Sequence, residues 1–213
     1  MGVARIEGAG LSREETVGHL AQIFPLVNAA IDEDSARFNY TYEGRVPLDI
    51  NLPEKVDRWA PRIQASGDLM ETGLSFYGAY HLDGEGQPRT APTDMLGMLI
   101  LRRGDNEEFP DAQVMLHNLY VYPHDPADAN RPLRSGRLAH LLIGEALRSV
   151  PPELSVIADV SPDRTEVFAS LQRRGFIVTQ AVVEKAPGQP GSDFVESRLE
   201  APAALVRQSF GVQ

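Results

Sequence analysis

The chain contains no cysteine in its 213 residues. Disulfide bonds, thiolate metal sites and cysteine nucleophiles are therefore excluded, and the reducing cytoplasm is the expected location. The sequence also lacks a run of about 18 apolar residues, the length that a membrane-spanning helix needs. We therefore expect no membrane partner.

Basic residues are scarce. The chain has 20 Lys and Arg against 30 Asp and Glu, which gives a formal net charge of -10. Binding to a nucleic-acid backbone needs a basic face, so we expect no nucleic-acid partner. An acidic surface suits cationic or amine-bearing small partners. Against this background Arg131, Arg134 and Arg137 stand close together and reverse the sign of charge locally.

The length and the ordinary hydrophobic content of 42% fit one sizeable core, so we expect a single domain over residues 1–213. The residue patterns predict helix, helix, strand, strand, strand, helix, strand, helix, strand and strand, in that order. The three successive strands are expected to form an antiparallel meander. The fold class is therefore α/β (α+β), with a mixed sheet flanked by helices.

Several boundaries follow from local signals. Ser12 and Glu15 form a capping box that begins the first helix, and Pro25 is expected to break that helix. A second helix starts at Pro53 and presents Val56, Trp59 and Ile63 on one face. The plausible caps of that helix are Asp49 and Asn51, and a later helix is expected to begin at Ser161 and Pro162 and to stop at Gly175.

The segment of residues 114–150 organises the chain. It opens as a strand that Pro123 closes, and it ends as a helix whose apolar side includes Leu138 and Leu142. We expect a loop between them that carries Arg131, Arg134, Ser135, Gly136 and Arg137. The first amides of a helix lack internal partners and carry partial positive charge, and glycine lets an anion approach the backbone. The pattern therefore predicts a phosphate site.

These features resemble the GCN5-related N-acetyltransferase (GNAT) superfamily over residues 73–199. In that family a strand of the type L-x-V-x-P precedes a pyrophosphate loop R/Q-x-x-G-x-G/A and a helix. The matching segments here are LYVYP at residues 119–123 and RPLRSG at residues 131–136. A later strand and helix ending in Gly-Phe match residues 156–176. The chain departs from the pattern at Arg134, in place of the middle glycine, and at Leu171, in place of a tyrosine that commonly protonates the departing thiolate.

The resemblance implies a splayed parallel strand pair at the centre of the sheet, with residues 1–70 as a helical acceptor side and residues 73–200 as the coenzyme-binding core. Acetyl-CoA, the implied co-substrate, would lie between the strand ending at Pro123 and the strand over residues 155–160. Its pantetheine would pair with the backbone of Leu119, Tyr120 and Val121. Its pyrophosphate would take the amides of Ser135, Gly136, Arg137 and Leu138 and the guanidinium groups of Arg131, Arg134 and Arg137.

A protonated amine must lose a proton before it attacks a thioester. His117 is the first candidate for this role, because imidazole titrates near neutrality, and Asp159 is the second. Ordinary strand packing for His117 and capping for Asp159 stay open as alternatives. His124, Asp125 and Asp128 have a spacing that fits no metal site, so we expect no metal.

Three functions remain open at this point. The chain could be an N-acyltransferase that moves acetyl from acetyl-CoA to a primary amine on a small molecule or peptide. It could instead be a non-catalytic GNAT-fold module that binds CoA or a protein, or an unrelated α/β protein whose arginine segment holds another anion. The sequence does not decide between a monomer and a homodimer.

Overall fold

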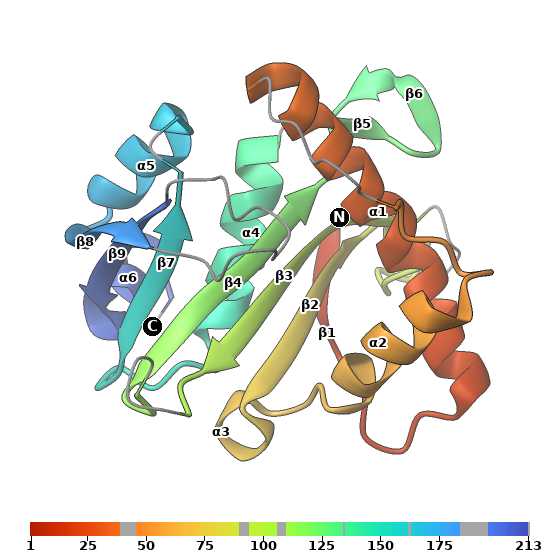
Figure 1. Cartoon of the computed structure of the whole chain (residues 1–213), viewed down its shortest axis with the longest axis horizontal. Helices are drawn as coiled ribbons and strands as arrows, with labels where there is room; N and C mark the ends of the chain where they lie inside the picture. The colour runs from red at the N-terminus through yellow and green to blue at the C-terminus, as the bar shows by residue number, and fades with distance from the viewer. Residues whose placement is uncertain are drawn as a thin grey trace.

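The computed structural model describes residues 1–38, 46–89, 94–105, 110–133, 135–161, 163–183 and 196–212. A seven-stranded sheet runs through these parts in the spatial order β1, β2, β3, β4, β7, β9, β8 (Figure 1). Its strands are β1 (Gly2–Ile6), β2 (Leu74–Tyr80), β3 (Met95–Arg103), β4 (Gln113–Val121), β7 (Ser155–Val160), β8 (Ile177–Val183) and β9 (Glu196–Pro202). Every neighbouring pair is antiparallel except β4 and β7, which are parallel. The predicted mixed sheet and the meander of β2, β3 and β4 are confirmed.

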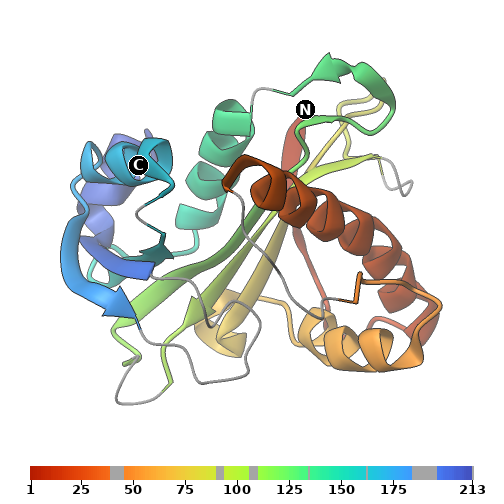
Figure 2. The ribbon, with the colours of Figure 1, turned by 45° about the horizontal axis from the view of Figure 1, so that its top comes forward.

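Six helices and a small hairpin complete the described part of the chain. The helices are α1 (Arg13–Phe38), α2 (Pro53–Gln64), α3 (Leu69–Thr72), α4 (Ser135–Leu147), α5 (Thr165–Gln172) and α6 (Ala203–Ser209). The hairpin consists of β5 (His124–Asp125) and β6 (Asp128–Pro132), and it stands at the end of the sheet where β4 finishes (Figures 1 and 2). In the described ranges none of the helices has both the length and the hydropathy that a bilayer crossing requires.

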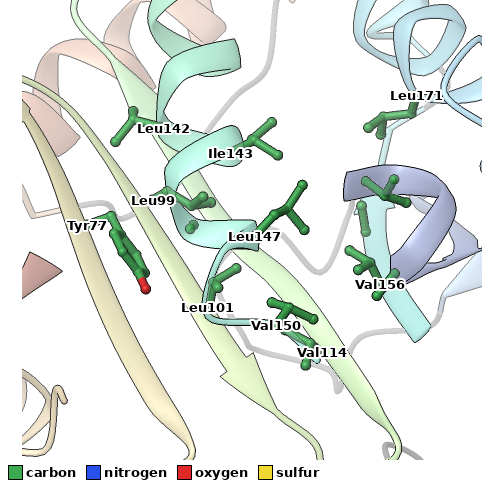
Figure 3. Close-up of a cluster of buried hydrophobic side chains, with 14 of the residues drawn as sticks. Tyr77, Leu99, Leu101, Val114, Leu142, Ile143, Leu147, Val150, Val156 and Leu171 are labelled. Atoms are coloured by element: carbon green, nitrogen blue, oxygen red, sulfur yellow. The ribbon is translucent and has the colours of Figure 1, made fainter. Parts of the chain in front are cut away.

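Two hydrophobic clusters cover opposite faces of the sheet. On one face α4 packs against β2 and β3, and Leu99, Leu101, Leu142 and Leu147 are fully buried there (Figure 3). On the other face α1 packs against β3 and β4, and α2 packs against α1. The largest fully buried side chains of this second cluster are Leu20, Ile23, Phe24, Leu26, Ile63, Phe76, Met95 and Met98. With α4 on one face and α1 with α2 on the other, the middle of the sheet is held rigidly.

The first two helices follow their sequence signals with two exceptions. The capping box is confirmed, because the Glu15 amide donates to the Ser12 hydroxyl at 3.2 Å and the Ser12 amide donates to the Glu15 carboxylate at 2.8 Å. The buried face of α2 is also the predicted one, Val56, Trp59 and Ile63. The predicted caps of α2 are wrong: Leu52 is the residue before the helix, and Asp49 instead accepts a hydrogen bond from the Asn51 amide at 2.9 Å.

The predicted break at Pro25 is wrong, because α1 runs without interruption from Arg13 to Phe38. Proline removes one helical hydrogen bond and crowds the preceding turn. Phe24, Leu26 and Val27 around it are nevertheless almost completely buried against the sheet. Burial of these three large side chains outweighs a single lost hydrogen bond.

The start of α5 also differs from the prediction. The helix begins at Thr165, with Arg164 before it and no side-chain cap. Ser161 lies four residues before the helix, and its hydroxyl accepts from the Asp163 amide at 3.3 Å. The predicted stop is confirmed: Gly175 has a φ of +91°, a conformation that a side chain disfavours, and the Phe176 amide donates back to the Leu171 carbonyl.

The capping box gives a first test. Ser12→Ala should lower the free energy of unfolding by about 1 kcal/mol, because the amide at Glu15 loses its acceptor. Ser35→Ala is the matched control at the other end of α1, since the Ser35 hydroxyl bonds only to the Ile31 carbonyl within the helix. Urea denaturation measures both. Equal effects at the two positions would contradict a specific cap.

Pro25 gives a second test. Pro25→Ala should raise the free energy of unfolding by up to about 3 kcal/mol, because alanine restores the missing amide and relieves the crowding. The side chain of Pro25 is exposed, so the substitution leaves no cavity. Thermal and urea unfolding report the change. A loss of stability would mean that the proline ring makes a packing contact more valuable than the helical bond.

Candidate functional site

The parallel pair β4 and β7 is joined over only part of its length. Gln113 pairs with Ser155, Val114 with Val156 and Met115 with Ile157, and no later pair follows. Both strands nevertheless continue, β4 to Val121 and β7 to Val160. Figure 1 shows the two arrows separating toward their carboxyl ends. Among the described residues the ladder between β4 and β7 therefore ends at Met115 and Ile157, and a ligand in strand-like conformation could lie between the two strands beyond that point.

A bulge lies in β4 where the split opens. Leu101 on β3 pairs with Leu116, but its neighbour Ile100 pairs with Asn118, which leaves His117 as the extra residue. An inserted residue bends and twists its strand locally. The His117 side chain is exposed. Simple alternation along β4 therefore fails here: Leu116 and Leu119, three positions apart, both pack against the cluster under α4.

The bulge also settles which way the later residues of β4 face. Leu119 and Val121 pack toward the α4 side of the sheet, whereas Tyr120 and Tyr122 pack toward the side of α1 and α2. Burial raises the pKa of Tyr122 to about 12, so its phenol stays protonated near neutrality. Leu119, Tyr120 and Val121 all lie beyond the last β4–β7 pair, in the part of β4 that borders the split.

The two candidate proton-handling residues lie at matching positions. Met115 and Ile157 form the last pair, and His117 on β4 and Asp159 on β7 each follow two positions later. The topology thus brings both to the base of the split. Asp159, however, forms a bidentate ion pair with Arg198 on β9. Arg198 donates to the two carboxylate oxygens from Nε at 2.9 Å and from Nη2 at 3.0 Å. This pairing makes Asp159 a weak candidate for a base.

The segment between β4 and α4 is a hairpin and not the loop that the sequence predicts. Arg131 lies in β6, and the turn closes on itself because the Leu133 amide donates to the Pro123 carbonyl at 2.9 Å. The chain therefore returns to the end of β4 before α4 begins. The hairpin of β5 and β6 makes up most of the segment between β4 and α4.

A buried carboxylate fastens the hairpin to the sheet. Asp125 is only 2% exposed and accepts from the Ala127 amide at 2.9 Å, and one of its oxygens lies 3.0 Å from Nε2 of His81. Arg131 is 3.5 Å from its other oxygen. Burial by itself raises the pKa of Asp125, but the bonds from His81 and Ala127 and the nearby positive charges outweigh it, so the pKa is lowered. Arg131 is thus partly engaged by Asp125.

The predicted phosphate-binding residues of α4 occupy its first turn. Ser135, Gly136, Arg137 and Leu138 all belong to the helix. Gly136 and Arg137 are exposed, and a Cβ built on Gly136 would meet no atom within 4 Å, whereas Leu138 is buried. The helix start is therefore open to solvent on the side of Gly136. Arg134 lies outside the described residues.

Two further features bear on the chemistry. Leu171 is 6% exposed and belongs to the cluster under α4, so no hydroxyl stands at this position to protonate a thiolate (Figure 3). A surface hollow of about 550 Å³ is lined by Pro152 and residues of α6 and the segment after it, at the closed end of the split. It contains none of the predicted site residues. In the described ranges no three His, Asp or Glu side chains gather in a way that could hold a metal.

Comparison with known proteins was informative only at the level of structure. No family model and no curated protein matches the sequence. Among solved structures, an N-acetyltransferase from Staphylococcus aureus Mu50 matches 95% of this chain and 99% of its own, with a TM-score of 0.57 and 12% identity. A variant of the spermidine N-acetyltransferase from Vibrio cholerae matches 97% of this chain and 98% of its own, with a TM-score of 0.54 and 14% identity.

At such identities the likeness concerns the fold. Both matches extend over nearly the whole of each chain. The resemblance inferred from the sequence, close over residues 73–199 and looser over the N-terminal helices, is therefore confirmed for the fold. The chain has the fold of the GNAT superfamily of acetyltransferases.

Proposed function

We propose that the protein is an acyl-CoA-dependent N-acyltransferase that transfers acetyl from acetyl-CoA to a primary amine within a ternary complex. The observation that carries the proposal is the split between β4 and β7. It combines two diverging strands with an exposed helix start at Gly136 and an exposed histidine at its base. The fold shared with N-acetyltransferases supports this reading.

The coenzyme would lie along the split with its pantetheine beside β4. Its amides would hydrogen-bond the backbone groups of Leu119, Tyr120 and Val121, which lie beyond the last β4–β7 pair. The diphosphate would reach the first turn of α4, where unpaired amides and the helix dipole favour an anion. Arg131, Arg134 and Arg137 would add positive charge around it.

The reaction removes two protons from the amine nitrogen and exchanges one bond. The ammonium first loses one proton, and the neutral nitrogen then attacks the thioester carbonyl carbon, whose oxygen takes up negative charge. The nitrogen loses its second proton as the carbon–sulfur bond breaks and the thiolate leaves. We assign the proton removal to His117, whose place in the bulge directs it away from the regular ladder of β4. With leucine at position 171, solvent would protonate the thiolate.

Asp159 is better suited to a positioning role than to proton transfer. Its two oxygens are taken by Arg198, and this pair joins β7 to β9 next to the split. Its carboxylate is already bound by a guanidinium, whereas the side chain of His117 is exposed. We therefore propose His117, and not Asp159, as the residue that removes the amine proton.

The acceptor would be a small molecule or a peptide with a cationic amine. The net charge of -10 attracts such molecules over the surface. One structural neighbour is a spermidine N-acetyltransferase, which is a transferase for a small polyamine. A cytoplasmic location remains a prediction, and the choice between a monomer and a homodimer stays open.

The alternative is a non-catalytic module that keeps the fold and binds CoA. Three observations favour it: Leu171 supplies no hydroxyl, Asp159 is occupied by Arg198, and Arg131 is engaged by Asp125. Binding of acetyl-CoA without thiol release across a broad panel of amines would select this alternative. Amine-dependent release of free CoA would reject it.

His117 provides the test of the chemistry. His117→Gln should lower kcat by about 10² to 10⁴, because general-base catalysis contributes that much, and should leave the Kd for acetyl-CoA unchanged. The acidic limb of the pH–rate profile should also disappear. His124→Gln, an exposed histidine on the hairpin, is the matched control. Thiol release with the best amine of a screen gives the rates, and calorimetry gives the Kd. Unchanged turnover in His117→Gln would remove it from the mechanism.

Gly136 provides the test of the diphosphate site. Gly136→Leu should raise the Kd for acetyl-CoA by about tenfold or more, because the added side chain occupies the space beside the first helical amides. The fold should tolerate it, since no atom stands within 4 Å of the new Cβ. Gly18→Leu on α1 is the control, because Gly18 is equally unobstructed and belongs to a different helix. Binding that is equally tight in Gly136→Leu would place the diphosphate elsewhere.

A further inference from the structure

A cluster of three side chains joins α4, α5 and the C-terminal segment on one face of the sheet. Arg174, just after α5, donates from Nη2 to Nδ1 of His140 on α4, at 3.2 Å. Its guanidinium carbon lies 4.5 Å from the ring centre of Phe210, which also stacks on His140 at 4.8 Å between centroids. The guanidinium is thus held in one place by a stacked ring and a ring nitrogen.

This guanidinium lacks an acidic partner. Among the described residues Arg174 forms no ion pair with a carboxylate, and its polar partner is the His140 ring. Burial and the charge of Arg174 both lower the pKa of the His140 imidazole, and the neutral Nδ1 can then accept from Arg174. A half-buried cation with no acidic partner is costly unless an anion offsets its charge. The chain has a net charge of -10, so a carboxylate beside a half-buried arginine would be common. The lack of one among the described residues near Arg174 therefore favours an anionic ligand at this position.

The cluster lies close to the start of α4. His140 follows Gly136 by four positions, so the two residues occupy the same side of the helix, about 6 Å apart along its axis. Gly136 is the open position beside the first helical amides. A ligand with one anionic group at the helix start therefore finds the guanidinium of Arg174 about one helical turn further along.

We propose that Arg174 is a specificity-determining residue that binds the 3′-phosphate of coenzyme A. This inference rests on the proposed function. Coenzyme A carries its diphosphate on the 5′ position and a separate phosphate on the 3′ position of one ribose, so its two anionic groups are a single sugar apart. The planar guanidinium fork matches phosphate oxygens in geometry and charge. Phe210 and His140 hold that fork in position before the ligand arrives.

The decisive experiment compares acetyl-CoA with acetyl-dephospho-CoA, which differs only in the 3′-phosphate. Wild-type protein should bind acetyl-CoA roughly 10- to 100-fold more tightly by calorimetry, the value of one charge-assisted contact. Arg174→Gln should abolish this preference while leaving the Kd for acetyl-dephospho-CoA unchanged. Arg174→Lys should keep part of it. Arg173→Gln, which removes an exposed charge from the adjacent residue, should keep all of it.

The outcomes separate this assignment from the proposed function. If the wild type binds both compounds equally, or if folded Arg174→Gln keeps the preference, the assignment to Arg174 is wrong and the acyltransferase proposal stands. If the wild type binds neither compound, both the acyltransferase proposal and the assignment to Arg174 are wrong. The comparison of the two compounds on the wild type needs no substitution, so it still tests for a 3′-phosphate site if Arg174→Gln fails to fold.

Discussion

The incomplete pairing of β4 with β7 is the constraint on which the rest of the structure depends. Three residue pairs join the strands, and both then continue without each other. Buried strand edges need hydrogen-bond partners, so an open edge inside a folded protein is stable only where a ligand or water can complete it. The two hydrophobic clusters hold the neighbouring strands rigidly on either side. The split is therefore enforced by packing at a distance from it.

The bulge in β4 connects this constraint to the chemistry. Because His117 is inserted between the paired residues Leu116 and Asn118, the strand turns at that point and its later residues change faces. On β7 the equivalent position holds Asp159, tied to Arg198. One side of the base of the split thus carries an exposed imidazole and the other a neutralised carboxylate. This asymmetry gives the two strands different functions in the proposed reaction.

Much of the fold could be predicted because local signals and burial agree. Val56, Trp59 and Ile63 lie at helical spacing and face the sheet, and Gly175 stops a helix with the backbone conformation that glycine allows. The failures occur where tertiary packing decides. Pro25 lies inside a continuous helix because the side chains around it are buried. The segment that carries Arg131 forms a hairpin, and its Asp125 binds His81, a residue distant in sequence. The bulge at His117 depends on register with β3, which no local pattern contains.

The hydrogen bond between the Leu133 amide and the Pro123 carbonyl has a consequence for how the site can vary. It brings the two ends of the hairpin together, so the length of the excursion is uncoupled from the position of α4. A shorter turn joined at the same two residues would leave the helix start where it is. The hairpin is therefore a place where sequence can be added or removed without disturbing the neighbouring strands, provided that the anchor at Asp125 is given up together with its partner His81.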